Sequence, residues 1–210
     1  MKKLFYLLLF MLIAILHSSY SQVKLGVMSY SYRHLPYEEM LQQLQRLNVH
    51  YVELYQGHIH YDKFTPEDAP EVIQTAKKYG VEIDVYHISG LGPDDEEKWD
   101  KAFRFAKALG VKVVSAAVSM DCCEIAQKYA NKYGLKFALH NHFVPMWSPG
   151  KWKTLEYYRD FEKIVRDYPD PAIGFNVDIG HIAISGGDPL YILKKYFNRT
   201  YHIHFKDYIM

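Results

Sequence analysis

The segments KKYGVEIDVYHI (residues 77–88), KALGVKVVSAAV (107–118) and NKYGLKFALHNH (131–142) share one pattern. In each of them a helix-like run ends at a glycine, and a run led by valine or leucine starts at the next residue. Glycine after a helix, followed by a short run rich in β-branched residues, indicates a helix that turns directly into a strand. Such turns are typical of α/β domains with a parallel sheet, either closed as a barrel or open and doubly wound.

The same alternation extends outward from these segments over the rest of the sequence. Strand starts recur roughly every 25 to 35 residues, which is the length of a βα unit. The expected strands cover residues 24–30, 50–55, 81–88, 111–118, 135–140, 172–178 and 200–205, and the expected helices cover 36–47, 65–79, 94–109, 121–133, 154–167 and 189–196. No G-x-G-x-x-G follows the first expected strand, which disfavours a dinucleotide-binding sheet.

The first residues have the features of a secretory signal peptide. A lysine pair precedes an apolar run over residues 4–16, and Ser19-Tyr20-Ser21 then offers small residues for cleavage. We therefore expect residues 1–21 to be a signal peptide and residues 22–210 to form the domain of a periplasmic or secreted protein. A retained N-terminal anchor is the alternative.

Composition narrows the choice of partners. Removal of the lysine pair changes the formal net charge from +1 to −1. A near-neutral protein lacks the basic surface that attracts nucleic acid or an anionic membrane, so we expect neither as a partner.

Cys122 and Cys123 are adjacent, and neighbouring cysteines rarely form a disulfide with each other. The domain must therefore rely on its core, for which 49% hydrophobic residues are sufficient.

Histidines gather at one end of the expected strands. Most of the 11 histidines lie at or just past a strand end: His34, His58, His60, His87, His140, His142, His181 and His204. A barrel places its active site at the carboxyl ends of its strands, where the βα loops begin. Any one of these histidines is more often structural, but their collective placement favours a barrel with a site at that end. We expect His58, His87 and His142 to contact a substrate there.

Two short motifs offer candidate metal ligands. In LHNH, His140 and His142 share one face of an expected strand, so both can point to one centre. In VDIGH, Asp178 ends a strand and His181 follows after an expected glycine turn. A carboxylate with imidazoles from neighbouring strands suits a divalent ion such as Zn²⁺, Mn²⁺ or Co²⁺. Capping of the next helix by Asp178 is the structural alternative, and the two roles are compatible.

The last expected strand and one internal acid complete the candidate site. His202, His204 and Lys206 alternate onto one face, and we expect His202 to be structural and one layer deeper than His204. Lys206 could neutralise a developing enolate or hold a substrate oxygen; a surface ion pair with Asp207 is the alternative. Glu53 lies inside a strand, where a carboxylate is costly without a partner, so we expect it in the site rather than facing the outer helices.

The segments LGVMSYSYR, YVELY, FALHNH, NVDIGH and HIHFKD occur in the order and spacing of the sugar phosphate isomerase/epimerase family, which the sequence resembles from residue 24 to residue 207. The resemblance implies an α/β fold of the TIM (β/α)8 type, xylose-isomerase-like, here with only about seven βα units. It also implies a divalent metal (Mn, Co, Zn or Mg) held by His140, Asp178 and His204, with His181 in contact with the substrate.

The sequence departs from this family at two places. The ligand on strand five is often a glutamate in epimerases, and His140 stands there instead, which argues against an epimerase base at that point. Family members also continue through an eighth strand that carries a metal-binding glutamate, whereas this sequence ends at Met210. We therefore expect a C-terminally incomplete barrel with weak metal binding and little turnover by the chain as given.

The expected function is that of a metal-dependent isomerase or epimerase of a sugar or sugar derivative, with Glu53, His181 and Lys206 as catalytic residues for proton transfer next to a carbonyl. A metal-dependent keto-sugar lyase or hydratase and a non-catalytic sugar-binding barrel are the alternatives. The expected partner is a small-molecule sugar or keto-sugar, with no membrane contact after signal cleavage. A homo-oligomer is left open.

The signal peptide leads to a direct test. Because the lysine pair, the apolar run and the cleavage site occur in order, we expect the secreted or periplasmic form to begin at Gln22. Mass spectrometry of the protein recovered from a host with a secretory pathway measures this start. A product that keeps Met1 and stays in the cytoplasm would contradict the prediction.

Overall fold

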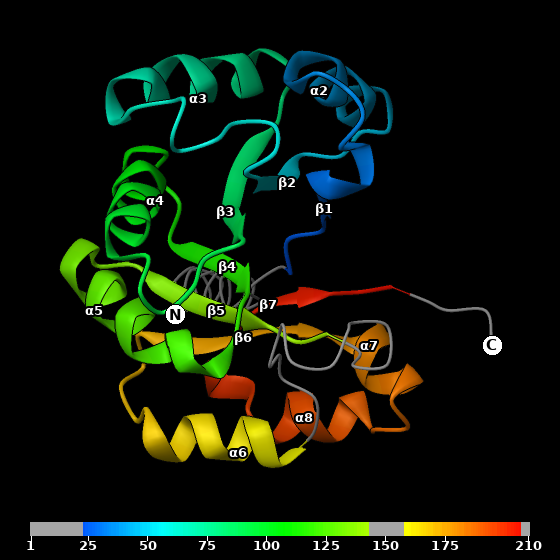
Figure 1. The fold of residues 1–210 in the computed structure, drawn as a ribbon. Coiled ribbons are helices and arrows are strands. Elements are labelled where there is room, and N and C mark those ends of the chain that lie inside the picture. Colours follow the sequence, from blue (N-terminus) through cyan, green and yellow to red (C-terminus); the bar gives the residue numbers. More distant parts are fainter. Residues whose placement is uncertain (1–22, 143–157, 207–210) are drawn as a thin grey trace, which may run out of the picture.

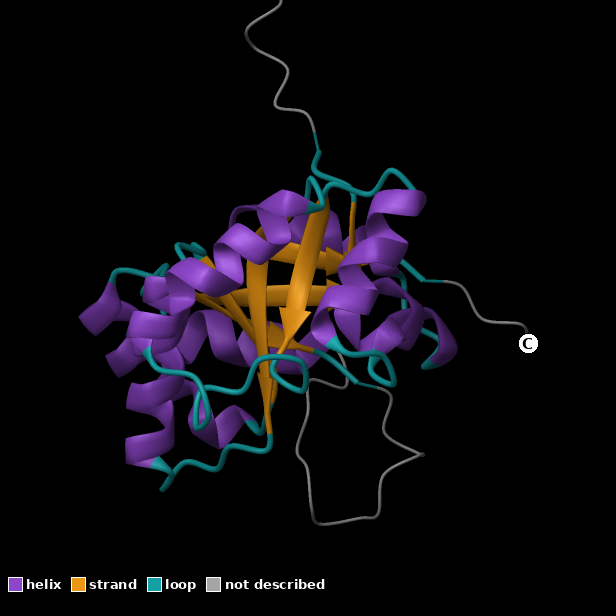
Figure 2. Cartoon of the chain, turned by 90° about the horizontal axis from the view of Figure 1, so that it is seen from above, coloured by secondary structure: helices purple, strands orange, loops and turns teal. Residues whose placement is uncertain are grey.

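The computed structural model describes residues 23–142 and 158–206. Seven parallel strands form one sheet in the order β1 to β7, and each strand pairs with its neighbours in sequence. The sheet curls into an open half-barrel with the helices on its outer surface (Figure 1). From above, the helices are seen around the strands (Figure 2). The predicted α/β fold of the TIM-barrel type, with seven strands, is confirmed.

The strands are β1 (Gly26–Met28), β2 (Tyr51–Tyr55), β3 (Glu82–Ser89), β4 (Val113–Ala117), β5 (Lys136–His140), β6 (Ile173–Asp178) and β7 (Thr200–His204). The helices are α2 (Tyr37–Arg46), α3 (Ala69–Lys78), α4 (Glu96–Ala108), α5 (Cys123–Tyr133), α6 (Tyr158–Asp167), α7 (Ile179–Ile184) and α8 (Pro189–Lys195). Four short 3-10 helices are η1 (Ser29–Tyr32), η2 (Pro66–Asp68), η3 (Met120–Cys122) and η5 (Phe197–Arg199).

Local chemistry accounts for these boundaries. Helix α5 ends at Gly134, whose φ of 66° is a left-handed conformation that glycine adopts without strain. Helix α8 begins after Asp188, whose carboxylate accepts hydrogen bonds from the backbone N–H groups of Leu190 and Tyr191. Pro189 occupies the first helical position, where its missing N–H costs nothing.

One connection differs from the sequence-based expectation. We expected a glycine turn between Asp178 and His181, but Ile179–Ile184 forms α7. The strand turns directly into a helix because the Asp178 carboxylate accepts the backbone N–H of His181 at 2.9 Å and caps the first turn. For the expected helix 154–167, the first residues lie outside the described part of the chain.

The two faces of the sheet differ in polarity. The outer face packs against the helices, as where Tyr86 meets Phe105 of α4 with ring centroids 5.6 Å apart. Because side chains alternate along a strand, the inner face receives the intervening residues. The inner face carries these buried polar side chains: Glu53, His87, Ser115, His140, Asn176 and Asp178. Parallel sheets usually bury apolar residues on both faces, so a polar interior indicates a functional role.

A recurring surface contact joins consecutive helices. In each case a lysine–tyrosine pair, on or just after one helix, meets a single carboxylate oxygen on the preceding helix. The cases are Lys78 and Tyr79 with Glu38, Lys128 and Tyr129 with Glu96, and Lys132 and Tyr133 with Asp100. Exposed pairs of this kind contribute little to stability individually, but here they define how one helix lies against the next.

The half-barrel has β1 and β7 as its edge strands. Within the described residues each of them pairs with one neighbour. Leu25, Ile203 and Phe205 on or beside these strands are 83%, 42% and 86% exposed. Both cysteines are buried free thiols, in agreement with the prediction that they form no disulfide with each other. No helix in the described part of the chain is long and apolar enough to cross a membrane.

Gly174 of β6 lies close against the chain at the start of β7. A Cβ atom there would lie 2.3 Å from the backbone oxygen of Arg199 and 2.3 Å from a ring carbon of Tyr201. We therefore expect Gly174→Ala to lower the free energy of unfolding by about 1–3 kcal/mol, measured by urea denaturation. Gly92→Ala is the control, because the nearest atom there is 3.5 Å away, and it should change stability by less than about 0.5 kcal/mol. Equal stability of the two variants would contradict the close approach.

Candidate metal centre at the carboxyl ends of the strands

The two carboxylate oxygens of Asp178, the last residue of β6, have different partners. Oδ1 caps α7 by accepting the N–H of His181. Oδ2 lies 3.1 Å from Nε2 of His140 and 3.5 Å from Nδ1 of His204. The backbone N–H of Asp178 donates to Oδ1 of Asn141 at 2.8 Å, which fixes the end of β6 against the residue after β5. Helix capping and a role in the site therefore coexist, as the sequence allowed.

His140, Asp178 and His204 converge because β5, β6 and β7 are neighbours that end at the same edge of the sheet. Nδ1 of His204 lies 3.1 Å from Nε2 of His140, so the three atoms are 3.1, 3.5 and 3.1 Å apart. Ligand atoms of a four-coordinate zinc ion, with bonds of about 2.0–2.1 Å, lie about 3.3 Å apart. The three side chains thus have the spacing of a metal site, while their role as ligands stays a prediction.

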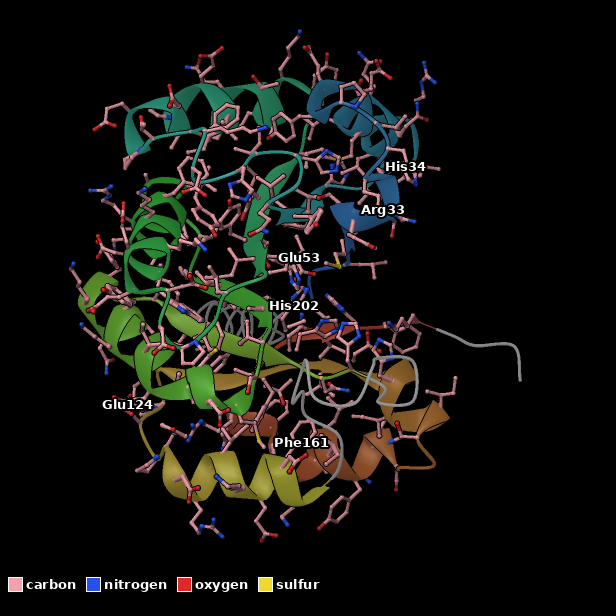
Figure 3. All side chains as sticks on the ribbon, in the orientation of Figure 1. Arg33, His34, Glu53, Glu124, Phe161 and His202 are labelled. Atoms are coloured by element: carbon pink, nitrogen blue, oxygen red, sulfur yellow. The ribbon has the colours of Figure 1, made fainter. Side chains whose placement is uncertain are left out.

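Glu53 of β2 lies on the other side of His204. Its Oε2 is 2.5 Å from Nε2 of His204 and 3.2 Å from Nε2 of His202. Its Oε1 is 3.2 Å from Nδ1 of His87 and 3.4 Å from Nδ2 of Asn176. Figure 3 labels Glu53 and His202 close together inside the curve of the sheet. This carboxylate is 3% exposed, and the nitrogens around both oxygens offset the cost of burying its charge.

Lys206, just after β7, joins the same site. Its Nζ lies 2.6 Å from Oδ2 of Asp178 and 2.9 Å from Nε2 of His181. The ring of His181 lies 4.5 Å from that of His142, which in turn lies 4.7 Å from the ring of His140. An ammonium group and a pair of imidazoles therefore stand next to the converging ligands. The alternative partner of Lys206, Asp207, lies outside the described residues.

The environment of the buried groups shifts their pKa values. Burial opposes ionisation of Glu53, but the charge of His204 and hydrogen bonds from the surrounding histidines outweigh it and lower the pKa of Glu53 well below its usual value. For Asp178, burial likewise raises the pKa, but hydrogen bonds from His140 and His204 more than reverse this effect. Burial lowers the pKa of His204, yet the two carboxylates prevail and raise it to about 9.

Three other imidazoles of the site, those of His140, His142 and His181, have lowered pKa values. Burial, together with the charge of a neighbouring histidine, lowers the pKa of His142 to about 4. Burial also lowers the pKa of His181 to about 4, against the attraction of Asp178. Burial lowers the pKa of His140 further than a hydrogen bond to Asp178 can restore it. Neutral imidazole is the form that binds metal ions and accepts protons.

The remaining predicted site residues lie in different places. His87 is buried on β3, with Nδ1 3.0 Å from Oγ of Ser115 as well as near Glu53. His58 lies in the loop after β2, and its Nε2 is 3.0 Å from the backbone oxygen of Ser29. Contact of His58, His87 and His142 with a substrate stays a prediction, as do the catalytic roles of Glu53, His181 and Lys206.

Sequence reasoning missed Asn176 and did not name the partner of His202. Asn176 lies at the centre of the inner face, with Nδ2 2.8 Å from Oγ of Ser115 and 3.1 Å from Nε2 of His204. Its position two residues before Asp178 on the same strand face was the available signal. His202 was expected to be structural, and the structure places it against Glu53. Its partner could not be named because β2 is distant in sequence.

The donor set fits a divalent cation. A carboxylate with imidazoles is the mixed N/O set that suits Zn²⁺, Mn²⁺ or Co²⁺. Nδ1 of His140 is buried without a hydrogen-bond partner among the described residues, and Nε2 faces Oδ2 of Asp178. The proton at Nε2 would move to Nδ1 when Nε2 binds a cation.

Two other groups have donor atoms within 4.8 Å of one another: Glu53, His202 and His204, and His140, His142 and His181. In the first, Oε2 of Glu53 and Nε2 of His204 are 2.5 Å apart, much closer than the spacing of about 3.3 Å between two ligands of one ion, and the second has no carboxylate to offset the charge of the ion. The set of His140, Asp178 and His204 is therefore the best candidate.

The raised pKa of His204 predicts alkaline destabilisation of the metal-free protein. Its pKa rises from 6.5 to about 9 on folding, so the stabilisation is complete below pH 6.5 and is lost as the pH rises through 9. The shift corresponds to a loss of about 2–3 kcal/mol, measured as the free energy of unfolding from pH 6.5 to 10. His204→Gln should lack this decline. An identical decline in the variant would assign it to another group.

Comparison with known proteins agrees with this geometry. Residues 41–209 match the family described as xylose isomerase-like TIM barrel. The chain is 27% identical over 183 residues to an inosose dehydratase of Mesomycoplasma hyopneumoniae (strain 7448), which covers 73% of this chain and 58% of that protein. The chain therefore spans less than two thirds of the length of this curated relative.

Solved structures share the fold. A sugar phosphate isomerase/epimerase from Parabacteroides distasonis superimposes with a TM-score of 0.65 at 19% identity, over 90% of this chain and 79% of that one. D-psicose 3-epimerase gives a TM-score of 0.69 at 13% identity, over 87% of this chain and 72% of that one. With most of its length matched and the same strand arrangement, the chain belongs to the xylose isomerase-like TIM barrel family.

Proposed function

We propose that this protein catalyses cation-assisted proton transfer next to a carbonyl group of a sugar or sugar derivative, and that the reaction is the loss or addition of water. The observation that carries the proposal is the convergence of His140, Asp178 and His204 within 3.5 Å, beside the contact between Lys206 and His181. Ligands for a cation and groups that can exchange protons thus share one site.

His140, Asp178 and His204 would hold the divalent ion, which when bound polarises a substrate carbonyl and makes the neighbouring C–H group more acidic. Asp178 contributes the negative charge, and the imidazoles contribute neutral nitrogen ligands. The polar inner face of the sheet keeps these side chains in place before a substrate arrives, because their rings contact one another and the buried carboxylates.

His181 and Lys206 are placed for the proton transfers. The imidazole of His181 is neutral and takes the proton from the carbon next to the carbonyl. The ammonium of Lys206 donates a proton to the departing hydroxyl group, which leaves as water. The 2.9 Å contact between Nε2 of His181 and Nζ of Lys206 lets the abstracted proton return to the amine, so both groups recover their initial state.

Similarity to a dehydratase supports loss of water as the reaction. Inosose dehydratase is the curated relative described above, at 27% identity. In addition, His140 ends β5, where the family resemblance places a glutamate in many epimerases, so this site has an imidazole in place of a carboxylate base.

Epimerisation or isomerisation is the second candidate reaction. The neighbouring rings of His142 and His181, with centroids 4.5 Å apart, favour it because two neutral imidazoles could remove and return a proton. Release into the periplasm or the medium after signal cleavage, and assembly into homo-oligomers, remain proposals for where and how the enzyme acts.

Cation binding tests the proposed ligands. We expect His140→Ala, Asp178→Ala and His204→Ala each to abolish binding of Zn²⁺ or Mn²⁺ in isothermal titration calorimetry, because each variant removes one of three converging donors. His34→Ala is the control, since His34 is exposed and Figure 3 labels it far from Glu53. Unchanged binding in all three site variants would rule out this metal centre.

Turnover distinguishes the reactions. We expect turnover by the cation-loaded chain to be low, but any conversion of keto-inositols or other keto-sugars should show the loss of one water molecule, observed by mass spectrometry. Lys206→Met should lower kcat by about 10²–10⁴ while cation binding persists, because a proton donor is lost but no ligand. Products of unchanged mass and inverted configuration would establish epimerisation instead. Ligand binding without any product would favour a binding protein.

A further inference from the structure

We propose that Glu53 is a positioning residue of the cation site: it holds the N–H of His204 at Nε2, so that the lone pair at Nδ1 faces His140 and Asp178. The inference rests on the proposed cation site and assigns to Glu53 a role that acts through His204 rather than on the substrate. The sequence had suggested a direct role for Glu53 in proton transfer.

The two nitrogens of His204 have unequal surroundings. Nε2 is 2.5 Å from Oε2 of Glu53, a contact between opposite charges that is shorter than the usual distance of about 2.7–2.9 Å. Nδ1 has weaker partners: it is 3.1 Å from the neutral nitrogen Nε2 of His140 and 3.5 Å from Oδ2 of Asp178, at the outer limit of a hydrogen bond. When a cation replaces one of the two protons, the weaker bond is the one to break. The proton at Nε2 therefore stays with Glu53, and Nδ1 becomes the ligand atom.

Asn176 cannot replace Glu53 as the hydrogen-bond partner of Nε2 of His204. Its Nδ2 lies 3.1 Å from Nε2 of His204 and could donate to that nitrogen only if Nε2 carried a lone pair. A lone pair there would face a carboxylate oxygen of Glu53 at 2.5 Å, and the repulsion of an ionised oxygen exceeds the gain from one neutral hydrogen bond. Glu53 thus decides which nitrogen of His204 carries the proton.

Glu53 is itself held in place. His202 contacts the same oxygen, Oε2, at 3.2 Å, and His87 contacts Oε1 at 3.2 Å. With nitrogens on both oxygens and 3% of the residue exposed, the carboxylate cannot rotate away from His204 without breaking other contacts. A carboxylate that accepts the second N–H of a metal-binding histidine also increases the basicity of the ligand nitrogen.

The unaltered protein provides the first test. Cadmium-113 replaces the cation, and nitrogen-15 spectra of the His204 ring report which nitrogen is coupled to the metal. We expect coupling to Nδ1, with the proton retained at Nε2. Coupling to Nε2 would overturn the proposal, because Glu53 and His204 would then share an ion instead of a proton.

Variants provide the second test. We expect Glu53→Gln to weaken Zn²⁺ binding by about 10–100-fold, since the outer partner of a ligand histidine has effects of this size. Ser115→Ala is the matched control, because Ser115 is buried on the same inner face and its hydroxyl contacts His87 and Asn176. Its affinity should equal that of the unaltered protein. Equal affinity of Glu53→Gln and Ser115→Ala would overturn the proposal.

Stoichiometry and the metal-free protein separate the remaining outcomes. One bound Zn²⁺ per chain agrees with the proposal. Two bound ions, of which one is lost in the variant His202→Gln, would show that Glu53, His202 and His204 bind a second ion. That result would overturn the proposal. If no cation binds, the proposed function fails. In that case the role of Glu53 can still be tested at alkaline pH, where the His204 ring is neutral. A proton at Nε2 in the unaltered protein supports positioning by Glu53, and a proton at Nδ1 contradicts it.

Discussion

The imidazole of His204 lies between two buried carboxylates, Glu53 at 2.5 Å and Asp178 at 3.5 Å. Each carboxylate alone would be costly to bury, and together they would repel each other across the interior. A positively charged ring between them offsets both effects, which is why the pKa of His204 rises while the pKa values of both acids fall. The contact also links β7 to β2, strands that are not neighbours in the sheet. Curvature of the sheet brings β2 and β7 close enough for this one ring to join them in the site.

The same arrangement explains why this interior is polar. An apolar inner face would give a more stable sheet, because buried ionised groups rarely stabilise a fold more than well-packed apolar residues do. Here His140, Asn176 and Asp178 are buried next to one another, and each has contacts within the cluster. A cation that binds at His140, Asp178 and His204 would take over the positive charge that His204 supplies in its absence. The protonated ring therefore keeps the ligand atoms close to their binding positions.

The sequence predicted the strands and the end of the sheet that carries the site, because both depend on local patterns. Glycine after three of the helices indicated where strands begin, and histidines after the strands indicated the functional edge. The contact between Glu53 and His204 joins residues 151 positions apart, and it exists only because the sheet curls. The pairing of Lys206 with Asp178 was missed for a similar reason: nearby Asp207 offered a local partner, whereas the observed one comes from the neighbouring strand. Helix α7 was missed because a glycine after Asp178 suggested a turn, and only the capping bond shows that a helix starts there.

The lysine–tyrosine pairs that join consecutive helices have a consequence for how the chain assembles. In each case the basic and aromatic groups belong to the later helix and the carboxylate belongs to the earlier one, as with Lys78, Tyr79 and Glu38. When a new βα unit forms, the carboxylate that accepts its hydrogen bonds is therefore already present on the preceding helix. Domains generally fold from the amino end as synthesis proceeds, and such backward-facing contacts let each unit dock in order without waiting for a later partner. At these two junctions, between α2 and α3 and between α4 and α5, the later helix can dock on its predecessor as soon as it forms.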